Sequence, residues 1–293
     1  MVAEMVRLEA GALRLEIAPA IGGSIQHFSL GDGLQRFLIL RGGDPDGGVL
    51  AASSFPLVPF VNRIRGGRFS FRGKEIVLRP NMAGDPSPLH GQGWLGSWTV
   101  GRHDEAAAAL SFRHEADEWP WAYQAVQSFE LDERGLSLRL ECRNLDETSM
   151  PCGLGQHPYF HCGPETRLAT TVKSAWTIDA NVLPVEKVPA EGAFDLSDRL
   201  VCGQGLDHGF GGWGGNAALS DPAWPCGLRL SSPNANFFQL YSPREGGIFV
   251  AEPVTHANAA LNAPEADWAE LGLKVLEPGA AMHLDMRLDV LPK

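Results

Sequence analysis

The stretch VQSFELDERGLSLRLEC, residues 126–142, decides the fold class. Phe129 and Leu131 alternate with polar residues, a polar turn follows at residues 132–135, and three leucines alternate again at residues 136–140. Successive side chains of a strand point to opposite faces, so this pattern is typical of two antiparallel strands that each bury one face. The segment therefore predicts a β-hairpin.

The same two-residue period recurs at residues 13–17, 69–78 and 284–290, and Arg72-Gly73-Lys74 supplies a turn within the second of these stretches. The 34 glycines and 21 prolines suit a chain with many turns. Helical periodicity is confined to a short stretch at residues 265–271. Strand signals about ten residues apart, with no linker or repeat between them, predict an all-β protein. We expect one large antiparallel β-sandwich domain over residues 1–293.

Composition excludes several classes of partner. Hydrophobic residues make up 44% of the chain, enough for a sizeable core. The net charge of -11 opposes binding to nucleic acid or to an anionic membrane, so we expect neither. Residues 1–19 carry charges throughout, which argues against a signal peptide, and no apolar run is long enough to span a membrane.

The five cysteines are an odd number and contain no CxxC pair. This pattern predicts buried free thiols rather than a disulfide framework, and with them a cytoplasmic location. The positions are Cys142, Cys152, Cys162, Cys202 and Cys226.

Polar residues inside apolar runs are the candidates for chemistry, because their burial costs free energy unless they are paired. Arg63 ends the run FPLVPFVNRI at residues 55–64, where it could bind sugar hydroxyls or a carboxylate, or form a structural ion pair. His90, in PLHG, could line a pocket or be a satisfied core histidine. Taken alone, each of these two residues is better explained by a structural role.

His157 lies in the irregular stretch MPCGLGQHPYFH at residues 150–161. His161 is four residues further on, but Pro158 argues against a helix that would place both on one face, so we predict no metal site. Glu252 ends the apolar strand in GIFVAEP, where burial would raise its pKa and make it a stronger base; a structural pair with an arginine is the alternative. The glycines after LDHGF, residues 206–210, lack the spacing of a nucleotide-binding loop.

Together these segments resemble the aldose 1-epimerase (galactose mutarotase-like) family, and in particular a compact bacterial branch of it. The matching stretches occur in the family's order, and they are PFVNRIRGGRFSFRGKEIVLRPN, PLHG, EWPWAYQAVQSFELDERGLSLRLECRN, MPCGLGQHPYF, LDHGF and AEPVTHANAALN. The resemblance implies a β-sandwich, the galactose mutarotase-like supersandwich, with an open, cofactor-free cleft on one sheet. It also implies His157 as general acid and Glu252 as general base. The implied substrate-binding residues are Asn62, Arg63, His90 and Asp207.

The chemistry of an isomerase that interconverts sugar anomers fits this pair. A base must remove the proton of the C1 hydroxyl while an acid protonates the ring oxygen, and each such group contributes about 10²–10⁴-fold. We expect the carboxylate and the imidazole on opposite sides of the sugar ring, with no metal, nicotinamide or covalent intermediate. The expected partner is a small sugar, bound by a monomer or homodimer.

The preferred sugar is predicted to be a neutral aldose. Arg63 and Arg65 could together bind an anion, but Gly66-Gly67 is predicted to turn the chain and carry Arg68 and Arg72 onto a solvated hairpin. Three alternatives stay open: a hexose-6-phosphate 1-epimerase, a non-catalytic sugar-binding protein, and a glycosidase with Glu252 and Asp207 as its two carboxylates. The last would leave His157 without a role.

Overall fold

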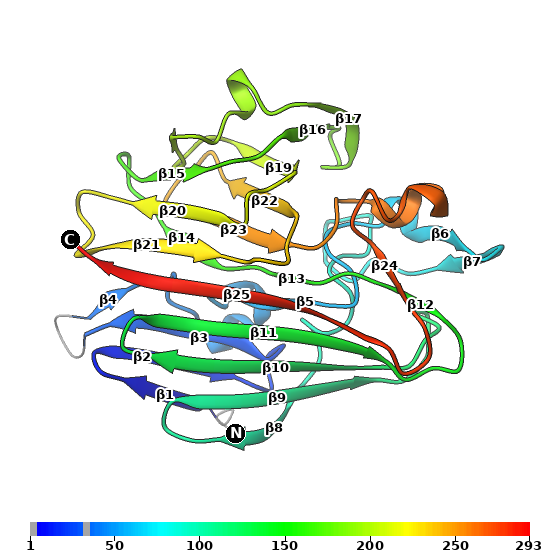
Figure 1. The fold of residues 1–293 in the computed structure, drawn as a ribbon, viewed down its shortest axis with the longest axis horizontal. Helices are drawn as coiled ribbons and strands as arrows, with labels where there is room; N and C mark the ends of the chain where they lie inside the picture. The colour runs from blue at the N-terminus through cyan, green and yellow to red at the C-terminus, as the bar shows by residue number, and fades with distance from the viewer. Residues whose placement is uncertain (1–4, 32–35) are drawn as a thin grey trace.

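The hairpin predicted at residues 126–142 lies within the largest sheet of the protein, in a computed structural model that describes residues 5–31 and 36–293 (Figure 1). Its strands, β10 (Tyr123–Asp132) and β11 (Gly135–Asn144), pair without interruption over ten residues each. The sheet has nine strands in the order β18-β15-β20-β21-β25-β11-β10-β9-β8. The other seven are β8 (Thr99–His103), β9 (Ala107–His114), β15 (Arg167–Thr170), β18 (Arg199–Leu200), β20 (Asn216–Ser220), β21 (Cys226–Ser231) and β25 (Ala281–Pro292).

A second sheet, of eight strands, is built from shorter and less regular pieces. Its order is β17-β16-β19-β22-β23-β13-β5, and β14 also pairs with β23. Two of its strands have only two residues, because prolines and glycines interrupt the ladder there. The strands are β5 (Pro56–Leu57), β13 (Gly155–Gln156), β14 (Tyr159–His161), β16 (Ser174–Ile178), β17 (Pro184–Pro189), β19 (Leu206–Gly211), β22 (Phe237–Ser242) and β23 (Ile248–Val254).

Three small sheets and several short helical turns complete the described residues. The four-stranded sheet contains β1 (Val6–Ala10), β2 (Leu13–Ala18), β3 (Ser24–Leu30) and β4 (Phe37–Leu38). The two-stranded sheets are β6 (Arg68–Phe71) with β7 (Lys74–Val77), and β12 (Met150–Cys152) with β24 (Lys274–Leu276). The 3₁₀ turns are η2 (Pro45–Gly47), η3 (Val49–Ala51), η4 (Arg65–Gly67), η5 (Gly192–Phe194), η6 (Ala260–Asn262) and η7 (Glu265–Asp267).

The two large sheets share one core. Leu138 and Leu140 of β11 belong to the same buried cluster as Phe238 and Leu240 of β22. Burial of these apolar faces against each other is what holds a sandwich together. The predicted all-β sandwich is confirmed.

The short helical stretch expected at residues 265–271 forms only in part. The chain forms only η7 and one further turn, in which the Leu271 amide donates to the Asp267 carbonyl over 3.0 Å. Gly272 then takes a φ of +86°, and a Cβ at this position would collide with the carbonyl oxygen of Thr255. The chain therefore leaves the helical conformation at Gly272.

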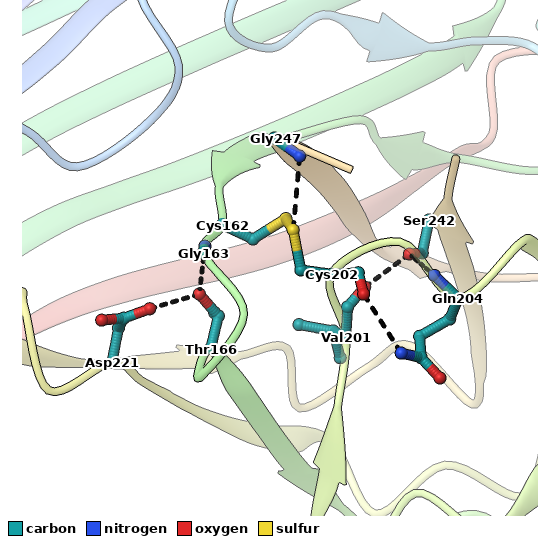
Figure 2. The surroundings of a disulfide bond; sticks show 9 residues. All are labelled: Cys162, Gly163, Thr166, Val201, Cys202, Gln204, Asp221, Ser242 and Gly247. Atoms are coloured by element: carbon teal, nitrogen blue, oxygen red, sulfur yellow. Dashed lines mark hydrogen bonds between the residues drawn. A yellow bond between two sulfur atoms is a disulfide. The ribbon is translucent and has the colours of Figure 1, made fainter. Parts of the chain in front are cut away.

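The cysteine prediction is wrong for one pair. Cys162 and Cys202 form a disulfide with their Cα atoms 5.5 Å apart (Figure 2). Cys142, Cys152 and Cys226 are buried and free. An odd count excludes complete pairing but leaves room for a single bond, and residues 40 positions apart give no local signal of it. The cysteines therefore no longer support the predicted cytoplasmic location.

Residues 1–4, part of the segment in which no signal peptide is predicted, lie outside the described residues. Among the helices of residues 5–31 and 36–293, none has the length and apolar character needed to cross a membrane.

Candidate active site

All six predicted site residues line a single cavity of about 260 Å³. Asp207 and Glu252 come from the eight-stranded sheet, and the others come from the irregular segments beside it. The complete lining is Leu50, Phe55, Asn62, Arg63, Met82, Leu89, His90, Trp94, His157, Tyr159, Asp207, Tyr241 and Glu252.

The strand register explains how distant segments meet at this cavity. β19 pairs with β22, placing Asp207 opposite Tyr241, and β22 pairs with β23, placing Gln239 opposite Glu252. Residues two apart on a strand share a face, so these four side chains point to the same side of the sheet. The Gln239 side-chain amide donates to Asp207 Oδ1 over 2.8 Å, which fixes that carboxylate.

His157 stands in register with Glu252, although the ladder between them is broken. Gly155 of β13 pairs with Val254, and Tyr159 of β14 pairs with Val250. The two pairs are four positions apart on each side, with three residues between them, so the middle residue of one interval, His157, lies opposite the middle residue of the other, Glu252. Their side chains touch, with His157 Nε2 3.3 Å from Glu252 Oε1.

The contact between His157 and Glu252 contradicts the expectation that the two groups lie on opposite sides of a sugar ring. It also bears on whether Glu252 is paired with an arginine. The imidazole and the carboxylate lie side by side rather than across the space of a sugar ring. Glu252 contacts His157, and no arginine of the described residues lies within ion-pair distance of its carboxylate. The structural pair with an arginine is therefore not formed.

Packing, rather than a hydrogen bond from Nδ1, holds the His157 ring. The ring stacks on Phe55 with centroids 4.5 Å apart and an interplanar angle of 18°, and it lies 4.7 Å from the Tyr159 ring. The backbone amide of His157 donates to the Phe55 carbonyl over 3.1 Å. Nδ1 is buried with no hydrogen-bond partner among the described residues, so Nε2 is the nitrogen aimed at Glu252.

Burial shifts both members of the pair toward their neutral forms. It lowers the pKa of His157 to about 3, with the Arg41 charge acting in the same direction. Burial also raises the pKa of Glu252 well above its ordinary value, and the neighbouring Asp207 adds to this rise. Because the pKa of Glu252 is raised while that of His157 is lowered, a single proton shared by the pair resides on Glu252 and leaves His157 neutral.

Asn62 and His90 lock each other through backbone contacts. The His90 amide donates to the Asn62 carbonyl over 3.0 Å, and the Asn62 amide donates to His90 Nδ1 over 3.1 Å. Both residues have a φ of 58°, a left-handed conformation that costs free energy and concentrates at functional sites. Because Nδ1 is an acceptor and burial lowers the pKa of His90, the ring is neutral and Nε2 carries its proton. His90 thus serves as a hydrogen-bond donor, and its structural and cleft-lining roles coincide.

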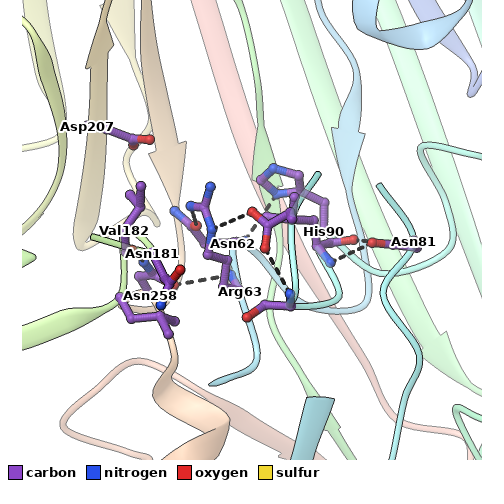
Figure 3. A network of polar contacts seen from close by, with 12 residues as sticks. Asn62, Arg63, Asn81, His90, Asn181, Val182, Asp207 and Asn258 are labelled. Carbon is purple, nitrogen blue, oxygen red and sulfur yellow. Dashed lines mark hydrogen bonds and ion pairs between the residues drawn. The ribbon is translucent and has the colours of Figure 1, made fainter. Parts of the chain in front are cut away.

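Arg63 is also both structural and exposed to the cavity. Its Nε donates to Asp85 Oδ2 over 2.8 Å. Its Nη1 donates to Asn62 Oδ1 over 3.1 Å, and its backbone amide donates to Asn258 Oδ1 (Figure 3). A guanidinium has five N–H donors, so three remain for a ligand after these two side-chain bonds.

The rest of the basic cluster is turned away from the cavity. Gly66 and Gly67 turn the chain with positive φ values, as predicted. Arg68 and Arg72 lie on the exposed β6–β7 hairpin, and Arg65 pairs with Asp179 at 3.5 Å. None of these three arginines lines the cavity.

The sequence pattern did not predict two residues of the site, Tyr241 in the cavity lining and Asp85 beside it. Tyr241 had a usable signal, because it alternates with buried Phe238 and Leu240 on β22. Asp85, which pairs with Arg63, gave no signal, because it lies in a polar loop. His161 is exposed at the end of β14, and no group of three potential metal ligands comes together anywhere in residues 5–31 and 36–293.

Comparison with known proteins gives a consistent family. A family model described as aldose 1-epimerase matches residues 4–289. The uncharacterized protein YphB of Escherichia coli K12 is 31% identical, over 97% of each chain. A crystal structure of an Escherichia coli K12 protein provisionally assigned as an aldose 1-epimerase matches with a TM-score of 0.91 and 29% identity, over 99% of each chain.

A galactose mutarotase-like protein from Clostridium acetobutylicum shares the fold more distantly. Its TM-score is 0.85 at 20% identity, over 98% of this chain and 95% of that one. At this identity the likeness shows the fold alone.

Proposed function

The chain belongs to the aldose 1-epimerase family, and we propose that it interconverts the α and β anomers of a free aldose. The observation that carries this proposal is the contact between His157 and Glu252 in a cavity lined with hydrogen-bonding side chains. The two oxygens that exchange protons in this reaction, O1 and O5, are bonded to the same carbon. An acid and a base that lie side by side can therefore reach both.

Ring opening needs one proton on the pair. Transfer from Glu252 Oε1 to His157 Nε2 gives a carboxylate beside an imidazolium. The carboxylate then removes the O1 proton, the C1–O5 electrons leave with O5, C1 and O1 form the aldehyde, and His157 protonates O5. After rotation about C1–C2, the same steps in reverse close the ring on the other face. In each direction the pair takes up one proton and gives up one, so it holds one proton throughout, and no covalent intermediate forms.

The remaining polar residues position the sugar. Arg63 and the Nε2–H of His90 donate hydrogen bonds, whereas Asp207 accepts them from sugar hydroxyls. Asn62 supports both donors through its backbone and side chain. Such positioning lowers the barrier by bringing C1 and its oxygens to the catalytic pair.

The alternatives fit the geometry less well. In a glycosidase Glu252 would act with Asp207, yet Glu252 is in contact with His157. A non-catalytic sugar-binding protein has no need of a buried acid–base pair, which is costly to bury. A hexose-6-phosphate 1-epimerase would need several basic residues around one anion, but Arg65, Arg68 and Arg72 lie outside the cavity.

The test is anomer exchange measured by NMR on glucose, galactose, arabinose and glucose 6-phosphate at one ionic strength, with a chelator present. We expect acceleration for at least one neutral aldose, without added metal or nucleotide. Activity that needs a divalent ion would contradict the metal-free mechanism. An advantage of tenfold or more for the phosphate, lost in Arg65→Ala, would instead support the hexose-phosphate alternative.

A further inference from the structure

We propose that Asp85 is a specificity-determining residue, whose carboxylate neutralises Arg63 and so restricts the cleft to uncharged sugars. This inference rests on the proposed function, because it concerns which sugars the same cavity accepts. Asp85 does not line the cavity, so it acts through Arg63 and is a positioning residue rather than a catalytic one.

The ion pair between Arg63 and Asp85 is largely withdrawn from solvent. The side chains are only 12% and 8% exposed, and Nε lies 2.8 Å from Oδ2. The other oxygen, Oδ1, accepts a 2.8 Å hydrogen bond from the Ser87 amide, so the carboxylate is held in place by a second contact. A pair screened from water in this way interacts more strongly than a surface pair.

The charges that line the cavity give this pair its effect on specificity. Arg63 is the one lysine or arginine among the lining residues, and the two lining histidines are neutral because burial lowers the pKa of His90 and of His157. The lining also contains two carboxyl groups, those of Asp207 and Glu252. With Asp85 cancelling Arg63, the residues that line the cleft offer hydrogen-bond donors but no net positive charge. Arg41, whose charge acts on His157, stacks on the Tyr159 ring and is not among these lining residues. A neutral hydroxyl can use those donors, whereas an anionic sugar gains no compensation for losing its water.

The substitution Asp85→Asn tests the negative charge of Asp85 separately from its hydrogen bond. The amide oxygen of asparagine can still accept from the Ser87 amide, so the loop keeps its hydrogen bond while Arg63 loses its counter-ion. We expect the kcat/KM of glucuronate relative to glucose, and of galacturonate relative to galactose, to rise at least about tenfold. The rise should come mainly through KM and should weaken as salt is added, because salt screens the attraction.

Asp179→Asn is the matched control. It removes the same charge from the chain, but Asp179 pairs with Arg65, which lies outside the cavity. We expect this variant to keep the wild-type ratio. Asp85→Glu, which restores the carboxylate, should return the ratio toward the wild-type value, an effect that a purely structural role of Asp85 would not produce.

If Asp85→Asn does not fold, the proposal can still be tested on the wild-type protein. It should process each uronate at least about tenfold less efficiently than the matched neutral sugar. The proposal is overturned if wild type prefers a uronate, if Asp85→Asn folds and keeps the wild-type ratio, or if Asp179→Asn raises the ratio equally. Failure of wild type to accelerate any sugar would instead overturn the proposed function.

Discussion

The β10–β11 hairpin and the β13–β14 segment obey the same strand geometry, but only one of them carries the site. In the hairpin, ten consecutive residues of each strand pair, so one face is committed to the core. Between β13 and β14 the register continues while the pairing stops, and His157 stands in this gap opposite Glu252. A break in a ladder thus leaves two facing side chains with room beside them.

Strand β22 of the eight-stranded sheet likewise has one face in the core and one face toward the site. On β22, Phe238 and Leu240 face the shared core, whereas Gln239 and Tyr241 face the other way. In the hairpin the outward face meets solvent, but here it supports the cavity, and Gln239 remains buried. In both regions the alternation therefore predicts which side chains point away from the core. The neighbouring segments decide whether those side chains meet solvent or support the cavity.

The largest effect should be on kcat, and it should come from the two residues that face each other at the break in the ladder, His157 and Glu252. His157→Asn and Glu252→Gln should each lower kcat at least about 10²-fold, because each removes one of the two proton-transferring groups. Arg63→Ala should act more on KM than on kcat. Initial rates of anomer exchange, with circular dichroism to confirm folding, give the measurement.

His161→Asn is the control for this first prediction, since His161 lies four residues from His157 but is exposed and outside the cavity. It should leave kcat unchanged. A Glu252→Gln protein with near-normal kcat would show that the base is another residue.

A substitution in the core of the β10–β11 hairpin should affect stability rather than kcat, unlike the substitutions of His157 and Glu252. Leu138 is 2% exposed, and Leu138→Ala should lower the free energy of unfolding by about 2–5 kcal/mol through lost burial and a residual cavity. Denaturant unfolding measures this loss, while kcat of the folded protein should stay the same. Glu130→Ala, an exposed position of the same hairpin, should change stability by no more than about 0.5 kcal/mol. A fall in kcat for Leu138→Ala would mean that the two regions are coupled.

Local patterns were sufficient to predict the hairpin and the all-β class, because alternation and turn residues lie within one short stretch. The site residues were another matter. His157 and Glu252 are far apart in the sequence, and nothing in either segment reveals the register that brings them together. Arg63, His90, His157 and Glu252 stand out in the sequence as polar residues in apolar or irregular stretches, and the family resemblance adds Asn62 and Asp207 and implies the roles of all six. The structure gathers all of them around one cavity.

Features that depend on contacts between distant segments were missed. Asp85 lies in a polar loop whose residues are ordinary for a surface, and only its contact with Arg63 gives it significance. The Cys162–Cys202 bond likewise joins segments that are not neighbours in the sequence. Pro158 argues against a helix, and strands β13 and β14 flank it, but a local pattern cannot show that the break in pairing there faces Glu252.

The smallest expected effect is a change in the stability of the folded protein. We expect Glu252→Gln to stabilise the protein at pH 7. Burial raises the pKa of Glu252 in the folded state, so the stabilising effect of its protonated form is complete below the unfolded-state value of about 4.3. This contribution is lost as the pH rises through the folded-state pKa. Glutamine never ionises and avoids the loss, which predicts a Tm higher by a few degrees, since about 1 kcal/mol moves Tm by about 2–4 °C in a large domain.

Comparing the two proteins across pH separates this ionisation from any change in packing. Their difference in Tm should be small near pH 4 and should grow as the pH rises, with Glu252→Gln the more stable protein. His157 acts in the opposite direction in both proteins, because its lowered pKa of about 3 makes folding less favourable as the pH falls below about 6.5, and it therefore largely cancels in the difference. A difference that is constant with pH would show that the substitution acts through packing. A Glu252→Gln protein that is less stable at pH 7 would show that the carboxylate of Glu252 stabilises the folded state, and that the site is not held at a cost to stability.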